Sequence, residues 1–359
     1  MKIAIYSPYL DTSGGGEKYM MTIAEALVPD HQVFVLLDSH LSSLDIEDIK
    51  SKIESFHKID LSNIKFINSP LGKGSSFFSR LFFLKRFDFL FYLTDGSIFL
   101  STAKNSAIHF QVPFRNLSKS SIWGRFKLSS WKLAICNSLF TQNIIKDEWS
   151  IKSEIIYPPV SIESFKPLKK KKMILSVGRF FGYSKVKKHE ILIKAFKNIF
   201  SKGLKEWSLH IAGGASAEDL DYVKELKKIS NGYPIYFYPN SSFSNLQKLY
   251  GESSIYWHAA GFGETDPKNM EHFGISVVEA MSAGCVPVVI RKGGLTEIVT
   301  EGQSGFLWDN LEQLEDFTVN LVKNRNLMER LSKEARVKSR KFDKENFIKS
   351  IKRLVDKNE

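Results

Sequence analysis

The chain has 359 residues, of which 43% are apolar, and its formal charge is +12. This apolar content excludes an intrinsically disordered chain, and the length predicts two domains in place of a single core. The positive charge favours an acidic partner, such as nucleic acid, anionic lipid or a phosphorylated substrate.

Runs rich in β-branched and aromatic residues alternate with amphipathic segments along the whole sequence. The runs expected to be strands are KIAIYSP, HQVFVLL, IKFIN, FDFLFYL, SAIHFQV, KLAICNS and EIIYPPV in the first half, and MILSVGR, SLHIAGG, PIYFYPN, SIYWHAA, VPVVI and GFLWD in the second. Strand–helix alternation predicts parallel sheets covered by helices on both faces. The predicted fold is therefore α/β, with two doubly wound domains.

The boundary between the two sets of strands falls in YPPVSIESFKPLKKKK, where two prolines end a strand and a lysine run follows. We expect an N-terminal domain over 1–165 and a C-terminal domain over 166–340. A helix in 341–359 is expected to pack back towards the N-terminal domain.

Targeting signals are not evident. No apolar run reaches the roughly 18 residues of a membrane-spanning helix. The apolar stretch in MKIAIYSPYL is too short for a signal peptide. Cys136 and Cys285 form no paired framework, as expected for a reducing compartment. We therefore expect a cytoplasmic protein.

Two loops that follow strands carry phosphate-binding signals, because ligands of doubly wound domains bind beyond the carboxyl ends of strands. In SPYLDTSGGGEKYM, three glycines including Gly15 and Gly16 open a helix whose free N–H groups attract anions. The alternative is a flexible turn without ligand. In LSVGRFFGYSKVKKHEILIKAF, Arg179 ends a strand and three lysines precede a helix. The alternative there is basic surface.

The stretch EHFGISVVEAMSAG places Glu271 and Glu279 eight positions apart. Gly274 precedes a helix predicted over 275–283, whose N-terminus favours negative charge. Glu279 lies inside this helix and is suited to hydrogen-bond the hydroxyls of a ribose, as acids do in nucleotide sites. Cations and a helix N-terminus for a diphosphate, with an acid on each side, predict a nucleotide-sugar site.

The motifs VGR…K…LIKAF and EHFGISVVEAMSAGCVPVV…GG…EIV, with GGGEKY…IAEAL and CNSLFTQNIIKD…IIYPPV, resemble those of retaining glycosyltransferases of family 4. The resemblance covers nearly the whole chain. It implies the GT-B architecture, in which two Rossmann-like domains face a cleft. The KKH and EHFGI elements are most similar to mannosyltransferases that act on lipid-linked oligosaccharides.

The resemblance also implies roles for particular residues. Glu279 would hold the ribose of the donor, Glu271 would contact the donor sugar, and the loop YPNSSFSNLQKLY would border the base. His109 matches a histidine aimed at the donor sugar, and its alternative reading is a structural histidine. The implied phosphate and donor contacts are Gly178, Arg179, Lys187, Phe273, Gly274 and Ile275, with Gly15 and Gly16 lying against phosphate or acceptor; Lys185 and Lys188 are near alternatives to Lys187.

The implied mechanism needs neither a metal nor another cofactor. The cations and the helix dipole stabilise the leaving diphosphate, and the resemblance implies retention by a front-face reaction. The D-x-D element formed by Asp219 and Asp221 stands at a helix start, where acids serve as caps.

The acceptor side is expected in the N-terminal domain. Aromatic and basic residues gather in 75–86 and 115–132, which favours docking on an anionic membrane surface, with packing in the core as the alternative. The acceptor would be a glycan or a polyprenyl-linked glycan, as in polysaccharide or lipopolysaccharide biosynthesis.

The expected donor is GDP-mannose, with UDP-sugars next. A protein that only binds nucleic acid would not need Glu271 and Glu279 beside the cations, so nucleic acid is not an expected partner. The alternatives are a non-catalytic sugar-nucleotide- or nucleic-acid-binding protein and a GT-B sugar-nucleotide epimerase.

Overall fold

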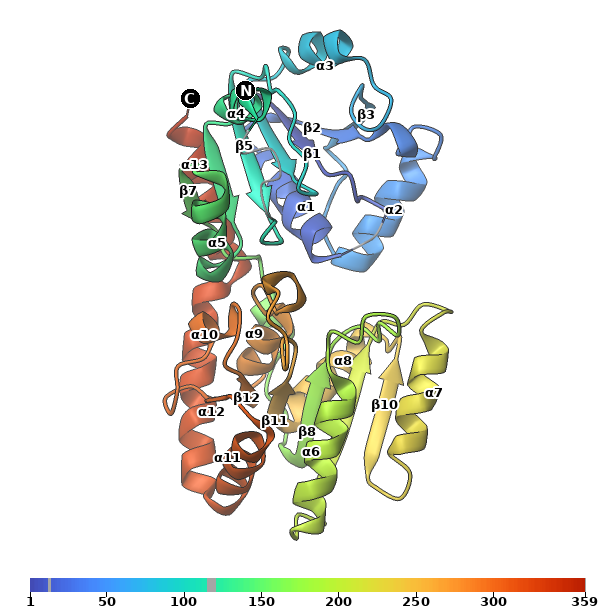
Figure 1. Ribbon diagram of the computed structural model, residues 1–359, viewed down its shortest axis with the longest axis vertical. Coiled ribbons are helices and arrows are strands. Elements are labelled where there is room, and N and C mark those ends of the chain that lie inside the picture. The colour runs from blue at the N-terminus through green and yellow to red at the C-terminus, as the bar shows by residue number, and fades with distance from the viewer. Residues whose placement is uncertain (12–13, 115–120, 359) are drawn as a thin grey trace. The chain divides into compact units, whose positions relative to one another are not determined.

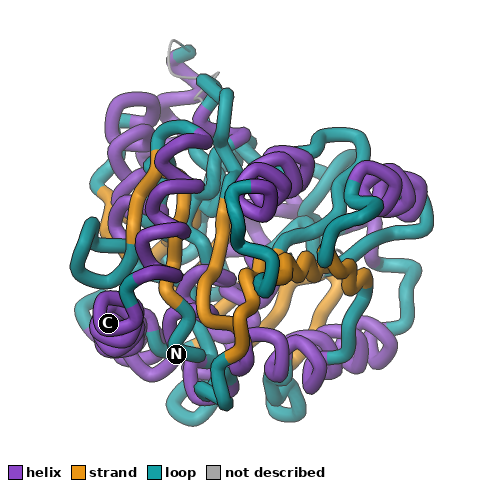
Figure 2. The backbone as a smooth tube through the Cα atoms, turned by 90° about the horizontal axis from the view of Figure 1, so that it is seen from below, coloured by secondary structure: helices purple, strands orange, loops and turns teal. Residues whose placement is uncertain are grey.

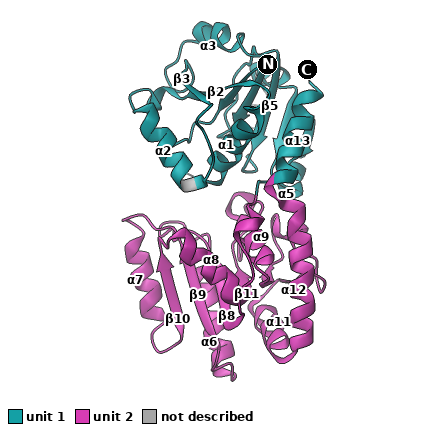
Figure 3. Ribbon diagram, turned by 180° about the vertical axis from the view of Figure 1, so that it is seen from behind, with its two compact units in different colours: residues 1–159, 345–359 teal, residues 160–344 magenta. Residues whose placement is uncertain are grey.

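The computed structural model describes residues 1–11, 14–114 and 121–358. The chain divides into two compact units (Figure 3): unit 1 comprises Met1–Pro159 with Glu345–Glu359, and unit 2 comprises Val160–Lys344. Each unit contains a parallel sheet with helices packed on its faces (Figures 1 and 2).

The sheet of unit 1 has the order β3-β2-β1-β4-β5-β6-β7 in the described residues. Its strands are β1 (Lys2–Tyr6), β2 (Gln32–Leu37), β3 (Lys65–Asn68), β4 (Phe89–Leu93), β5 (Asn105–Phe110), β6 (Leu133–Cys136) and β7 (Ser153–Ile155). Its helices are α1 (Gly15–Leu27), α2 (Ile46–His57), α3 (Phe77–Leu84), α4 (Ile122–Ser129), α5 (Leu139–Trp149) and α13 (Lys344–Asp356).

The core of unit 1 lies on both faces of this sheet. One apolar cluster joins β1, β2 and β4 to α1 and α13, and the other joins β4, β5 and β6 to α3 and α5. Because all five residues of β4 are buried, its sequence FLFYL is a continuous apolar run without polar alternation. Residues Phe347, Ile351, Leu354 and Val355 of α13 complete the first cluster.

The sheet of unit 2 has the order β10-β9-β8-β11-β12-β13. Its strands are β8 (Lys171–Val177), β9 (Ser208–Gly213), β10 (Ile235–Pro239), β11 (Ser253–His258), β12 (Val286–Ile290) and β13 (Phe306–Trp308). Its helices are α6 (His189–Ser201), α7 (Leu220–Ile229), α8 (Phe243–Glu252), α9 (Ile275–Ser282), α10 (Leu295–Ile298), α11 (Leu311–Lys323) and α12 (Arg325–Ser339).

The strand orders have the pattern of doubly wound folds, in which the sheet is built outward in both directions from a central pair of strands. The switch point lies between β1 and β4 in unit 1 and between β8 and β11 in unit 2. Every strand predicted from the sequence is present, and the α/β prediction with two doubly wound sheets is confirmed. Ligands of such sheets bind beyond the carboxyl ends of the switch-point strands.

Two helices were predicted with stated bounds, and the structure has a helix in each place. The helix expected over 275–283 is α9, and the helix expected at the C-terminus is α13, which belongs to unit 1. Among the described residues, no helix combines the length and the apolar character needed to cross a bilayer.

Candidate active site

The loop after β8 carries Gly178 and Lys187. A Cβ atom placed on Gly178 would lie 2.9 Å from Cγ of Lys187, so only glycine leaves room for the lysine stem. Lys185 and Lys188 have φ values of 47° and 55°, in the left-handed region. Each such residue costs roughly 1 kcal/mol or more, and strain of this kind gathers at functional sites. The backbone of this loop therefore restricts where the Lys187 side chain can lie.

Lys187 and Glu271 form a short, largely buried ion pair. The Nζ atom of Lys187 lies 2.6 Å from Oε2 of Glu271, and Nε2 of His258 lies 2.9 Å from the same oxygen. Burial alone would raise the pKa of Glu271, but the Lys187 ammonium and the His258 hydrogen bond outweigh it and hold that pKa well below its usual range. The Glu271 carboxylate is therefore charged throughout the physiological pH range.

The neighbouring lysines have other partners. Lys188 pairs with Glu264 at 2.5 Å, and Lys185 lies 3.4 Å from Glu190. Lys187, the lysine chosen from the sequence over Lys185 and Lys188, is the one of these three whose ammonium contacts Glu271.

The N-terminus of α9 lies three residues beyond Glu271. Gly274 is its N-cap and has a φ of 114°, a conformation that residues other than glycine adopt only under strain. Ile275 begins the helix, and the buried Phe273 packs edge-on against Phe342. The Gly294 N–H, in the loop after β12, donates to the carbonyl of Glu271 at 2.8 Å. This hydrogen bond joins the loop after β12 to the loop that carries Glu271. The first turn of α9 thus begins three residues beyond Glu271, and the N-terminus of a helix is the kind of place where anions bind.

Glu279 lies one turn further along α9. The Tyr250 hydroxyl, from the segment expected to border the base, donates to Oε2 of Glu279 at 2.9 Å. The buried Tyr256 hydroxyl lies 2.9 Å from Oγ of Ser276 and donates to the carbonyl of Val177 at 3.2 Å. Tyr256 thus ties the first turn of α9 to the last residue of β8, directly before the Gly178–Arg179 loop.

Arg179 was expected to end the strand, but β8 ends at Val177, so Arg179 lies two residues further on, in the loop. Its guanidinium carbon lies 5.6 Å from the centre of the Phe181 ring. The same loop is held by Asp219, whose carboxylate accepts from the Gly182 N–H at 2.9 Å and from Ser216. Asp219 is the N-cap residue of α7, but its carboxylate caps this loop in place of the helix. Asp221 pairs with Lys224 on the surface.

His109 lies in β5 of unit 1 and is fully buried. Its ring stacks on Tyr19 with centroids 3.9 Å apart, and its Nε2 lies 3.0 Å from Oε1 of Gln111. Burial lowers the pKa of His109 to about 4, so the imidazole is neutral at physiological pH. These contacts are structural, and its contact with the donor sugar stays a prediction.

The glycine loop of unit 1 follows β1 at the switch point. Gly15 begins α1, and a Cβ atom on Gly16 would lie 2.9 Å from Leu93 at the end of β4. The Gly14 N–H donates to Oε2 of Glu17 at 2.7 Å. One donor of this helix N-terminus is therefore already used by an acid of its own first turn.

Two short helices of unit 1 expose aromatic side chains; we call α3 and α4 with their flanking cations the α3–α4 surface. Phe77, Phe78 and Phe82 of α3 are 44%, 69% and 74% exposed, and Ile122, Trp123 and Phe126 of α4 are 85%, 68% and 52% exposed. Both helices bond the segment between them: Thr102 donates to the Leu81 carbonyl, and the Ser101 N–H donates to Ser130. Core packing is therefore wrong for these side chains. The 115–120 part of the predicted docking segment lies outside the described residues.

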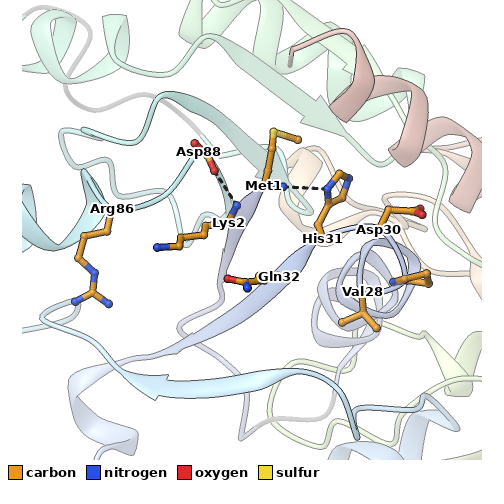
Figure 4. Close-up of a pocket in the computed structure, with 9 residues that line it drawn as sticks. Met1, Lys2, Val28, Asp30, His31, Gln32, Arg86 and Asp88 are labelled. Carbon is orange, nitrogen blue, oxygen red and sulfur yellow. Dashed lines mark hydrogen bonds between the residues drawn. The ribbon is translucent and has the colours of Figure 1, made fainter.

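A hollow of about 670 Å³ lies at the amino ends of the strands of unit 1. Figure 4 shows its lining side chains, which come from Met1, Lys2, Val28, Pro29, Asp30, His31, Gln32, Arg86 and Asp88. None of the predicted site residues lines it. The hollow therefore lies at the opposite end of the strands from their carboxyl ends, where ligands of this fold bind.

The fold and the site together define a two-domain protein of the GT-B class. Three full-length structural matches share the fold: HepE from Anabaena in complex with UDP (TM-score 0.74, 18% identity, 99% of this chain and 100% of that chain), a glycosyltransferase from Rickettsia africae (0.74, 16%, 99% and 98%) and TarM (0.75, 12%, 98% and 98%). The family profile for glycosyl transferases group 1 matches residues 160–338. These residues therefore form a glycosyltransferase group 1 domain, which confirms the resemblance seen in the motifs.

Curated relatives are similar over a shorter span. A protein of Dictyostelium discoideum, named GDP-Man:Man(3)GlcNAc(2)-PP-Dol alpha-1,2-mannosyltransferase, is 27% identical over 308 residues, which are 75% of this chain and 59% of the relative. The Mus musculus protein of the same name is 30% identical over 246 residues, 62% of this chain and 46% of the relative. The chain thus spans less than two thirds of the length of these relatives.

Sequence reasoning missed three polar side chains of the site, namely His258 and Tyr250, which bond Glu271 and Glu279, and Tyr256, which bonds Ser276. His258 and Tyr256 stand two positions apart on β11, so both point to the same face of the sheet. The run SIYWH carries this signal, because polar-tipped side chains at alternate positions of a buried strand need hydrogen-bond partners. Tyr250 carries no such signal, since its partner Glu279 lies 29 residues away.

Proposed function

We propose that this protein is a retaining hexosyltransferase that moves mannose from GDP-mannose to a lipid-linked glycan. The observation that carries the proposal is the Lys187–Glu271 pair beside the N-terminus of α9, beyond the carboxyl ends of the switch-point strands. The group 1 domain supports glycosyl transfer, and the names of the curated relatives favour GDP-mannose and a lipid-linked acceptor.

The chemistry follows from the charge that develops when the sugar leaves its diphosphate. Negative charge grows on the leaving oxygen, and Arg179, Lys187 and the α9 N-terminus are the groups that stabilise it. Gly178 and the N–H groups of Phe273, Gly274 and Ile275 complete the diphosphate contacts. Glu279 accepts from the ribose hydroxyls and Glu271 from the sugar hydroxyls, so neither acid shuttles a proton. His109, Gly15 and Gly16 are assigned to donor and acceptor contacts of unit 1.

The test is a panel of sugar nucleotides supplied with a polyprenyl-diphosphate glycan as acceptor. We expect GDP-mannose to raise the thermal unfolding midpoint and to release GDP, with glycan extension seen by mass spectrometry. If UDP is released from a UDP-sugar and no GDP is released from GDP-mannose, the donor is the UDP-sugar and not GDP-mannose. If the protein is retained on a nucleic-acid column and no sugar nucleotide changes its unfolding midpoint, the alternative of a non-catalytic nucleic-acid-binding protein is favoured.

Transfer is expected to be independent of divalent metal, because the cations and helix N–H groups already neutralise the diphosphate. Asp219 is occupied by Gly182 and Ser216, which leaves the D-x-D element a structural role. Adding EDTA should leave the initial rate of GDP release unchanged. A rate that EDTA abolishes and Mg²⁺ or Mn²⁺ restores would return the metal to the mechanism.

We further propose that the protein is peripheral on the cytoplasmic face of a membrane, with the α3–α4 surface as its contact. The segment from Gly96 to Lys132 contains no acid, and exposed aromatic side chains accompany its cations. Each cation near anionic lipid contributes about 1 kcal/mol, and each aromatic side chain buried in the interface contributes about 1.5–3 kcal/mol.

Replacing Phe78 and Trp123 together by serine should therefore weaken binding to phosphatidylglycerol vesicles about 100-fold or more. The measurement is co-sedimentation, with neutral phosphatidylcholine vesicles for comparison. Tyr183, which is 90% exposed in unit 2, provides the matched control as Tyr183→Ser. Equal binding of the double variant and the control would rule out this surface.

A further inference from the structure

His258 is a buried polar residue that the proposed mechanism has not yet used. It is the last residue of β11, and its side chain is 2% exposed. Its ring lies nearly parallel to that of Tyr256, with centroids 6.4 Å apart. Its Nε2 lies 2.9 Å from Oε2 of Glu271. A strand thus delivers a rigid donor to the acid that faces the sugar.

The protonation state of His258 follows from its neighbours. Burial lowers the pKa of His258, Glu271 opposes that shift, and the Lys187 ammonium adds to it. The imidazole is therefore neutral and carries a single N–H. Since a carboxylate only accepts, the proton is on Nε2, as assigned from the hydrogen-bond network.

Both donors to Glu271 bond the same oxygen. Lys187 and His258 contact Oε2, and within the described residues Oε1 accepts no hydrogen bond. Turning the carboxylate would break two charge-assisted bonds at once. The orientation of Oε1 is therefore fixed before any ligand arrives.

The two donors differ in what happens to them when a diphosphate binds. Lys187 is a flexible ammonium that is needed at the phosphate oxygens, so its contact with Glu271 weakens in the complex. His258 is held in the sheet, and the proposed mechanism assigns it no contact with phosphate. It is the donor that remains on Oε2 throughout the reaction.

We propose that His258 is a positioning residue, which holds Glu271 so that Oε1 accepts a hydroxyl hydrogen of the donor sugar. This inference rests on the proposed function, because a sugar donor is what gives Oε1 its partner. It predicts that His258 affects the sugar half of the donor and leaves the nucleotide half alone.

The test compares His258→Leu, which removes the donor, with His258→Gln, whose side-chain amide can place an N–H near the position of Nε2. We expect His258→Leu to lower kcat with GDP-mannose about 10–100-fold, the value of one hydrogen bond to a charged group. The Kd for GDP, which lacks the sugar, should be unchanged. His258→Gln should recover most of the lost rate.

His210 provides a matched control, because it is a buried histidine of β9 whose nitrogens contact Ser208 and Tyr238. His210→Leu should leave the ratio of kcat to GDP affinity unchanged. Wild-type kcat in His258→Leu would overturn the inference, as would equal losses of GDP binding and kcat without rescue by glutamine. A wild-type protein that transfers no sugar overturns the proposed function first, which separates the two failures.

Discussion

Replacing Lys187 by methionine is expected to lower the turnover number about 100-fold or more while the protein stays folded. Removal of one preorganised donor from a site where negative charge develops typically costs 10²–10³ in rate. Methionine keeps the aliphatic stem that packs on Gly178, so the change isolates the ammonium. The measurement is GDP release at saturating GDP-mannose, with thermal unfolding as the test of folding.

The loop itself supplies the controls for this experiment. Lys188→Met removes a cation that pairs with Glu264, and Lys185→Met removes one that lies near Glu190. Both should turn over far faster than Lys187→Met. Arg179→Ala should behave like Lys187→Met, and near-normal turnover in both would contradict the diphosphate assignment.

Replacing Glu279 by alanine should raise the donor KM about 10–100-fold. A hydrogen bond to a charged group is worth about 1.5–3 kcal/mol, and each 1.4 kcal/mol changes an affinity tenfold. Because the ribose is common to GDP and GDP-mannose, the Kd for GDP should rise in parallel. Isothermal titration with GDP measures this effect without any turnover.

Glu279→Gln refines the result, since its amide oxygen can still accept from Tyr250 while the negative charge is lost. We expect an intermediate loss of GDP affinity. Glu312→Gln, at an exposed position of α11, is the matched control and should bind GDP normally. Unchanged GDP affinity in Glu279→Ala would show that this acid does not hold the ribose.

The fold could be predicted from the sequence because its signals are local. Strands buried on both faces read as continuous apolar runs, as FLFYL and VPVVI do, and the helices between them show the 3.6-residue period. The loops expected to bind phosphate could be located because they follow strands and carry glycines and cations, whereas the switch points themselves are known only from the strand order. Lys187 and Glu271 could be singled out through motif spacing and the family resemblance, but with separate roles and not as an ion pair.

The parts that could not be predicted depend on packing between distant segments. Lys187 and Glu271 are 84 residues apart, so their ion pair depends on the fold. The different partners of Lys185 and Lys188, which are Glu190 and Glu264, were likewise visible only in the structure. The burial of His109 against Tyr19 required the fold of unit 1. The exposed aromatic residues of α3 could not be told from core residues, because an eight-residue helix rich in phenylalanine suits both environments.

The composition of unit 1 has a consequence for how the chain is made. Its first 159 residues leave the ribosome early, but four apolar side chains of its core, Phe347, Ile351, Leu354 and Val355, follow only after the whole of unit 2. Unit 2 is contiguous and can fold as soon as it is synthesised. Until translation has passed residue 355, the apolar face of the amino-terminal sheet that α13 covers stays exposed to solvent. Unit 1 is therefore the unit that chaperones would have to protect during synthesis.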